Sequence, residues 1–326
     1  MISAGISTWN NLWSYRSNFG KESVPSTNDN NNIWRKHKSY IWKGDIDSDG
    51  IYTNFTGEDD NFNWGIGATQ ASTSNWQKAS ETTRYDHYSM SLEGKDINNN
   101  YSATKMGDDN SKVLAVSNAA YVDMYYSGAE YLSPDSSSYF DGEIKSAGYA
   151  PSTTAHTGDY VVAVSTGNAF EVAVPARSER DTPKKQRFKV SVWVRTPNKD
   201  NTQIKVGGAT VNFTTNETQT AGNWSLLNGY ITIPPAGATV AITSTSGTIE
   251  LDDFRLHPIT SSMTSYVYNE WDEVSYVTGA NGLSTHYIYD KAGRLEETWV
   301  EVLDNPSGSI VGGFKRVSKN IYTYKN

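Results

Sequence analysis

The stretch HYIYDKAGRLEETWVEV, residues 286–302, predicts a β-hairpin and thereby decides the class of fold. Tyr287 and Tyr289 flank Ile288, and a period of two places both tyrosines on one face of an extended strand. The Ala-Gly pair that follows turns the chain into LEETWVEV, a second run rich in strand-forming residues. Residues 286–302 are therefore expected to form two antiparallel strands.

This hairpin belongs to a repeat. SYVYNEWDEV (265–274) aligns with HYIYDKAGRL (286–295), and the pattern Tyr-x-Tyr-Asn/Asp places Tyr268 in phase with Tyr289. Tyr324 continues the same phase near the end of the chain. One hairpin cannot bury its apolar face alone, so we expect units of this kind to stack into a larger sheet or shell.

The N-terminal part carries a weaker version of the repeat. YDHYSMSLE (85–93) and GDDNSKVLA (107–115) align with the stretch that contains YDKAGRLEE. The segment between the two repeat regions differs, because FKVSVWVRT (188–196) and its neighbours are short strand patterns separated by polar turns, which is typical of a β-sandwich or jelly roll. The predicted organisation is hairpin material over residues 1–125, a jelly roll over 126–258 and truncated repeats over 259–326.

Composition supports a mainly β protein and excludes several partners. The 326 residues include 21 Tyr and 10 Trp, and the hydrophobic share is 37%. The formal charge of -8 comes without a basic stripe, so nucleic acid is not expected as a partner. No apolar run reaches the roughly 18 residues of a membrane span, and the absence of Cys excludes disulfides and thiolate metal sites.

HYIYDKAGRLEE resembles the YD repeat of bacterial Rhs proteins and the related teneurins. The matching positions are Tyr289, Asp290, Gly293, Arg294 and Leu295. The N-terminal stretch WRKHKSYIWKGDIDSDGIY (34–52) also resembles the segment that precedes the repeats in large bacterial surface Rhs proteins, and YSGAE (126–130) through ELDDFRLHP (250–258) is similar to carbohydrate-binding-module-like jelly rolls.

The resemblance implies a secreted or surface-exposed bacterial chain whose repeats form a hollow β-shell, often around a C-terminal toxin. The partners it implies are the rest of that shell and an enclosed toxin. Two positions depart from the motif, because Asn269 replaces its Asp in one copy and Gly107 replaces its Tyr in another. Irregular pairing is expected at those units.

The stretch DIDSDGIYTNFT (45–56) raises the question of a calcium site. Asp45, Asp47 and Asp49 alternate as in a calcium loop, but the twelfth position is Thr56 where a helix-flanked loop has a bidentate Glu. Asp-Gly between two strand-like runs is also a hairpin signal. Both interpretations remain open, and the hairpin turn is favoured.

The jelly-roll resemblance implies a second calcium site, structural in role. The positions that correspond to the family's ligands are Glu130, the turn from Thr157 to Asp159, and Asp252. Two carboxylates with carbonyl oxygens suit calcium, and such an ion would join distant parts of one domain. The alternative is a pair of solvated carboxylates.

Aromatic side chains give a third candidate site. Trp193 falls on the polar face of its strand, and together with Arg195, Trp224 and Tyr230 it is a candidate platform for a sugar ring. The alternative is that this face packs on the neighbouring hairpins.

No nucleophile elbow, phosphate loop or dinucleotide fingerprint occurs in the sequence. A hidden glycoside hydrolase would need two carboxylates that face each other across a cleft, and this leaves no local signature. We therefore expect a non-catalytic structural segment, with a glycan-binding adhesin module that uses Trp193 as the alternative and the hydrolase as a third possibility.

Overall fold

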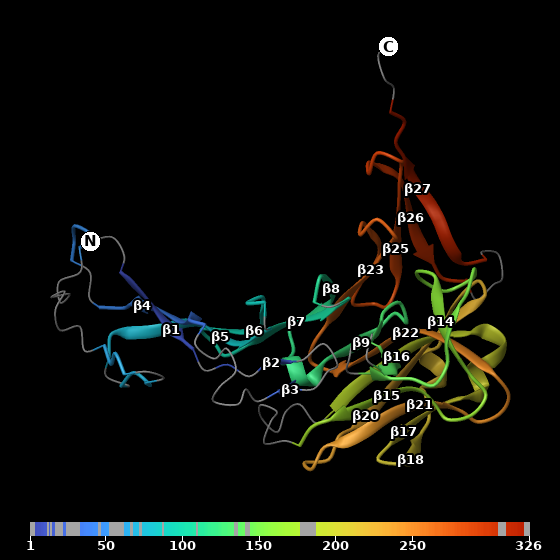
Figure 1. Cartoon of the computed structure of the whole chain (residues 1–326), viewed down its shortest axis with the longest axis horizontal. Coiled ribbons are helices and arrows are strands. Elements are labelled where there is room, and N and C mark those ends of the chain that lie inside the picture. Colours follow the sequence, from blue (N-terminus) through green and yellow to red (C-terminus); the bar gives the residue numbers. More distant parts are fainter. Residues whose placement is uncertain are drawn as a thin grey trace. The chain divides into compact units, whose positions relative to one another are not determined.

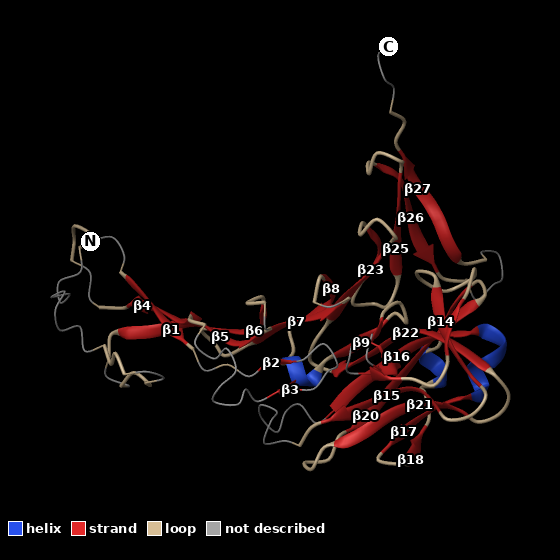
Figure 2. Ribbon diagram, viewed as in Figure 1, coloured by secondary structure: helices blue, strands red, loops and turns tan. Residues whose placement is uncertain are grey.

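The computed structural model describes residues 4–322 except for a set of short segments. These segments are 12, 14, 17–21, 24–32, 45–46, 52–61, 66–67, 72–73, 87, 109, 134–135, 141–143, 177–186 and 306–310. The chain divides into two compact units. The first ends at Ala103, and the second consists mostly of the residues from Thr104 onward. The described chain is built of antiparallel strands, with helices limited to short segments (Figure 2). The predicted mainly β class is confirmed.

The first unit is an antiparallel sheet in the order β1-β4-β5-β6-β7 (Figure 1). Its strands are β1 (Gly5–Asn10), β4 (Arg35–Trp42), β5 (Trp76–Tyr85), β6 (Ser91–Asp96) and the first part of β7 (Tyr101–Gly107), with β2 (Tyr15–Arg16) and β3 (Glu22–Ser23) as a separate pair. Tyr40, Trp42, Phe62 and Trp76 form its aromatic core, in which the rings of Tyr40 and Phe62 meet edge to face.

The second unit contains a β-sandwich of two antiparallel sheets. One sheet has the order β10-β11-β12-β15-β21-β17-β18, and the other has the order β13-β14-β22-β16-β20-β19 with β9 paired to β22. The strands of the first sheet are β10 (Leu132–Ser133), β11 (Ser136–Phe140), β12 (Ile144–Lys145), β15 (Asn168–Val174), β17 (Thr202–Val206), β18 (Ala209–Val211) and β21 (Ala238–Ser244). Those of the second are β9 (Tyr125–Ser127), β13 (Tyr149–Pro151), β14 (Tyr160–Val164), β16 (Arg187–Arg195), β19 (Gln219–Ala221), β20 (Trp224–Thr232) and β22 (Ile249–Pro258). Three short 3-10 helices are also described: η1 (Tyr121–Asp123), η4 (Thr196–Asn201) and η5 (Thr215–Glu217).

The sandwich core follows from the alternation in its strands. Phe188, Val190, Val192 and Val194 on β16 all point inward and are fully buried. They pack with residues from the facing sheet such as Phe170, whose ring stacks on that of Phe254. Burial of these side chains is the main contribution to the stability of the sandwich.

The second unit also carries the repeat hairpins. Their strands follow the order β8-β23-β24-β25-β26-β27, and all described pairs are antiparallel. The strands are β8 (Lys112–Ser117), β23 (Met263–Tyr268), β24 (Val274–Thr278), β25 (Ser284–Tyr289), β26 (Leu295–Val302) and β27 (Gly313–Lys319). The hairpin predicted over residues 286–302 is therefore present, whereas Tyr324 lies outside the described residues.

The repeat motif has a structural basis in these strands. The hydroxyl of Tyr268 donates to the carbonyl oxygen of Val113 at 2.8 Å, and the hydroxyl of Tyr289 donates to that of Val274 at 2.9 Å. Each motif tyrosine thus links its strand to the preceding strand of the sheet. The second tyrosine of the Tyr-x-Tyr pattern thus marks where this hydrogen bond between neighbouring strands recurs.

One five-residue turn recurs at the hairpins. At Asp290 the backbone N–H donates to the carbonyl of Arg294, the N–H of Gly293 donates back to the carbonyl of Asp290, and the N–H of Arg294 donates to Oδ1 of Asp290. The fourth residue, Gly293, has a φ of 74°. This combination of a type I turn and a left-handed residue matches the twist of the flanking strands.

The same turn closes other hairpins in both units. The three hydrogen bonds and the left-handed fourth residue recur in the turns that begin at Asp47, Asp86, Asp96 and Asn269. Residues 47–51 of the aspartate-rich stretch thus form this turn, while the segments that flank it, 45–46 and 52–61, lie outside the described residues. Asp45 and Thr56, which belong to the calcium-loop alternative, lie outside the described residues.

Replacement of the left-handed glycine tests the turn. Gly293→Ala should lower the free energy of unfolding by about 1 kcal/mol or more, because a side chain is strained at this φ. An added Cβ would also lie 2.9 Å from Oε1 of Glu273. Lys291→Ala, at an exposed position of the same turn, should change stability by less than about 0.5 kcal/mol in urea denaturation. Equal effects of the two substitutions would contradict this account of the turn.

Candidate functional site

A group of buried and partly buried charged side chains lies where the sandwich meets the repeat hairpins within the second unit. We call it the His156 cluster, and its members are Glu130, His156, Asp252, Asp253 and Glu301. His156 and Glu130 lie outside regular strands, Asp252 and Asp253 lie on β22, and Glu301 lies on β26. The cluster thus draws on both the sandwich and the hairpins.

A bulge in β22 brings two consecutive aspartates to the cluster. Along the β16–β22 ladder, Ser191 pairs with Arg255 and Trp193 pairs with Asp252, so β22 carries an extra residue at this point. Asp253 has a φ of 48°. Neighbouring residues of a regular strand point to opposite faces, and the bulge removes this restriction. Both carboxylates therefore contact the segment around His156.

His156 bridges two carboxylates. Its Nδ1 lies 2.7 Å from Oδ2 of Asp253, and its Nε2 lies 2.7 Å from Oε1 of Glu301. Burial alone would lower the pKa of His156, but the charge of Glu301 and the hydrogen bonds to both carboxylates raise it to about 10. His156 is therefore protonated at neutral pH and acts as a buried cation with both ring nitrogens engaged.

The two aspartates differ in their surroundings. Asp252 accepts the backbone N–H groups of His156 at 3.0 Å and Thr157 at 3.1 Å, but burial and the charge of Asp253 raise its pKa well above the usual value. Asp253 also accepts the hydroxyls of Tyr126 and Thr157, both at 2.9 Å. Although burial acts to raise it, the bond to His156 holds the pKa of Asp253 below its ordinary value.

Glu130 closes the cluster on the sandwich side. Its Oε1 accepts the N–H groups of Asp159 and Tyr160, both at 3.1 Å. Gly158, which directly precedes Asp159, has a φ of 62°, and a Cβ there would lie 2.2 Å from the same oxygen, so only glycine leaves room for the carboxylate. Burial raises the pKa of Glu130 to about 8, against the opposing effect of these hydrogen bonds.

Side chains of β16 and β22 also form hydrogen bonds to the hairpins. The indole of Trp193 stacks on His156 at a centroid distance of 4.0 Å, and its Nε1 donates to the carbonyl of Gly282 at 3.1 Å. Arg255 donates to the carbonyls of Gly279 at 2.7 Å and Thr278 at 2.9 Å. Within the hairpins, the N–H of Ser284 on β25 donates to Oε2 of Glu301 on β26 at 3.0 Å. The interface is thus fixed by directional bonds as well as by packing.

The predicted sugar platform is corrected by this arrangement. Trp193 is 1% exposed and Trp224 is 6% exposed, so neither indole offers a face to a sugar ring. Arg195 is paired with Glu250 at 3.0 Å and lies over the ring of Trp224. Tyr230 is 38% exposed, and its hydroxyl donates to Glu217. The alternative, in which the Trp193 face packs on neighbouring hairpins, matches the observed contacts.

The predicted metal ligands lie around one turn. Their negative charge suits a bound cation, but the peptide groups of the turn are not oriented to bind one. Four carboxylates of the cluster face two buried or largely buried cations, His156 and Arg255, so two negative charges lack a counter-charge if all the carboxylates ionise. A divalent cation would supply this balance. The turn from His156 to Tyr160, however, presents N–H groups to Glu130 and Asp252. The polar atoms of His156, Asp252 and Asp253 lie within 4.8 Å of one another, but a protonated His156 has no free ring nitrogen to offer an ion.

The sequence prediction missed His156, Asp253 and Glu301. Two signals were present, because His156 directly precedes the predicted Thr157 turn and Asp253 directly follows Asp252. Glu301 gave no signal, since it is 145 residues from His156 and lies in a run that reads only as a strand.

None of the helices in the described part of the chain is long and apolar enough to cross a membrane. A scan of protein-family models finds no match to the chain, and a comparison with curated proteins finds no similar sequence.

Proposed function

We propose that this chain is a non-catalytic structural segment of a bacterial Rhs/YD-repeat protein, in which a jelly-roll module is fixed to repeat hairpins of a β-shell. The observation that carries the proposal is the bridge of His156 between Asp253 on the sandwich and Glu301 on a hairpin strand. A buried ion pair requires precise geometry and so favours one fixed arrangement of the elements that contribute to it. A structural segment requires such a fixed arrangement, because it must hold its sandwich and its hairpins in one position.

The repeated turn supports the YD-repeat part of the proposal. Asn269 and Asp290 occupy the same position in successive repeats and form the same hydrogen bonds. The departure of Asn269 from the motif therefore preserves the turn, because an amide oxygen accepts the same N–H groups as a carboxylate.

Location and partners follow from the same proposal. The protein would be secreted or displayed at the cell surface, and its main partner would be the remainder of its own shell. A toxin enclosed by that shell would be a second partner. These statements depend on the sequence resemblance, and their direct test is the identity of the repeats and domains adjoining this segment.

A structural calcium ion is part of the proposal. Glu130 and Asp252 would supply carboxylate oxygens, and the Thr157 turn would complete the site after a local change in the orientation of its peptide groups. Burial, together with neighbouring carboxylates, raises the pKa values of Glu130 and Asp252, and a bound cation would favour the ionised form of both side chains.

The scaffold proposal predicts that the sandwich and the hairpins stabilise each other. Trp193→Phe removes the hydrogen bond to Gly282 but keeps an aromatic ring on His156, so it should cost about 1 kcal/mol of stability. Amide hydrogen exchange should become faster in β25 and β26 as well as in β16, since the lost bond joins the two parts.

Trp299→Phe is the matched control. The indole of Trp299 donates to Glu297 on its own strand β26, so its loss should affect exchange in the hairpins and leave β16 and β22 unchanged. If Trp193→Phe changed exchange only within the sandwich, the two parts would be independent and the scaffold proposal would fail.

A further inference from the structure

Three tryptophans of the first unit expose half or more of their surface. Trp9 is 56% exposed, Trp34 is 52% exposed and Trp64 is 68% exposed. All three line a cavity of about 260 Å³. Large exposed aromatic side chains gathered around one cavity mark an interaction site.

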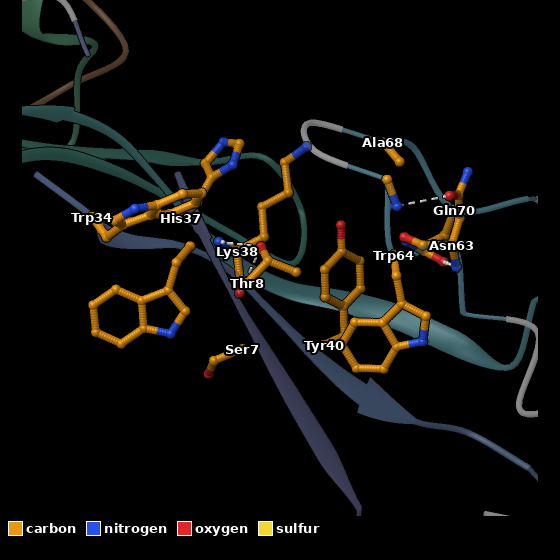
Figure 3. Close-up of a pocket in the computed structure, with 12 residues that line it drawn as sticks. Ser7, Thr8, Trp34, His37, Lys38, Tyr40, Asn63, Trp64, Ala68 and Gln70 are labelled. Atoms are coloured by element: carbon orange, nitrogen blue, oxygen red, sulfur yellow. Dashed lines mark hydrogen bonds between the residues drawn. The ribbon is translucent and has the colours of Figure 1, made fainter. Parts of the chain in front are cut away.

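The cavity has a polar floor between its aromatic ends (Figure 3). Trp34 and His37 lie on one side, Trp64, Asn63 and Gln70 lie on the other, and Thr8, Lys38 and Tyr40 lie between them. Indole faces combined with amide, hydroxyl and ammonium groups offer stacking and hydrogen bonding within one site.

The framework of the cavity is fixed before any ligand binds. The ring of Trp64 meets that of Phe62 edge to face at 4.6 Å, and Phe62 is buried in the aromatic core against Tyr40 at 5.0 Å. Oε1 of Gln70 accepts the N–H of Asn63 at 2.7 Å, and Nε2 of Gln70 donates to the carbonyl of Asn63 at 3.1 Å. A site held in this way binds without a large cost of ordering its own groups.

A second cavity extends the first along the same sheet. It has a volume of about 640 Å³ and shares Lys38, Tyr40 and Gln70 with the first cavity. Lys43, Asn75 and Gln77 also line it. The two cavities together form what we call the tryptophan groove, which combines the three exposed tryptophans with polar side chains such as Lys38, Asn63 and Gln70.

We propose that the tryptophan groove binds a polysaccharide chain. Sugar rings present C–H faces that stack on indoles and hydroxyls that need hydrogen-bond partners, and the groove provides both. Trp34 and Trp64 would hold successive parts of the chain, while Lys38, Asn63 and Gln70 bind hydroxyl groups between them. This role is independent of the scaffold function, and it uses a part of the protein remote in sequence from the buried Trp193.

The test uses the full chain and four soluble polysaccharides, namely xylan, a mixed-linkage β-glucan, a galactomannan and polygalacturonate. Isothermal titration should show millimolar or tighter binding to at least one of them. Trp34→Ala and Trp64→Ala should each weaken that binding roughly tenfold, since a few aromatic contacts carry most of the affinity of a binding site.

Trp271→Ala is the matched control. Trp271 is 76% exposed but lies in the turn between β23 and β24, so its loss should leave polysaccharide binding unchanged. Sedimentation of the same variants tests the competing occupant, a second copy of the chain. The proposal is overturned if none of the four polysaccharides binds, if binding persists in both groove variants, or if the groove tryptophans support only self-association.

Discussion

His156→Ala should lower the free energy of unfolding by about 3–5 kcal/mol, the range expected when one partner of a buried ion pair is removed. The substitution leaves Asp253 and Glu301 buried without the cation that lies 2.7 Å from each. It also removes the ring on which Trp193 stacks. Urea denaturation at pH 7, followed by tryptophan fluorescence, measures the loss.

His286→Ala provides the control for loss of an imidazole as such. His286 stacks on Tyr276 at 4.1 Å on the hairpin sheet, and burial lowers its pKa, so it is neutral at pH 7. Its removal should cost clearly less than that of His156. Equal losses for the two variants would show that packing, and not the buried charge, accounts for the effect.

The pH dependence of the difference between wild type and His156→Ala distinguishes charge from packing. A histidine whose pKa rises from 6.5 to about 10 on folding contributes stability that is fully present below about pH 6.5. This contribution is lost as the pH rises through 10, because the folded protein then releases the proton as well. The stability gap between wild type and variant should therefore narrow from pH 6.5 to pH 10, whereas a packing effect would remain constant.

The hairpins could be predicted from sequence because their determinants are local. Alternation fixes the faces of a strand, and Asp290 and Gly293 specify the turn through their own hydrogen bonds and φ angle. Stacking of hairpins into a sheet follows from their unburied faces. The same turn at Asp86 and Asp96 lacks glycine at its fourth position, and Ser89 and Asn99 take the left-handed conformation there, which a search for glycine would miss.

The candidate site could be predicted only in part because it depends on contacts distant in sequence. Glu130 and Asp252 were predicted through the jelly-roll resemblance, whereas the pairing of His156 with Glu301 requires knowledge of which hairpin covers the sandwich. Trp193 illustrates the same limit. Alternation identified its outward face, but a solvent-exposed face and one covered by a hairpin have the same pattern in sequence.

Chelation of calcium should lower the melting temperature of the wild-type protein if the proposed ion occupies the Glu130–Asp252 site. An ion that binds only the folded state at a concentration 100-fold above its dissociation constant stabilises that state by about 2.7 kcal/mol. For a unit of this size the shift is roughly 5–10 °C. The expected response is large because the ion would compensate carboxylates whose pKa values burial raises.

Isosteric variants locate the ion. Glu130→Gln and Asp252→Asn should each abolish the response to chelator, since each removes one carboxylate charge and keeps the side-chain volume. Asp47→Ala should retain the response, because Oδ1 of Asp47 already accepts the N–H groups of Asp49 and Ile51 within its own turn. A response lost in Asp47→Ala and kept in Glu130→Gln would move the ion to the aspartate-rich turn. The absence of any response in the wild type would instead mean that protonation of Asp252 and Glu130, and not a metal ion, offsets the excess buried negative charge.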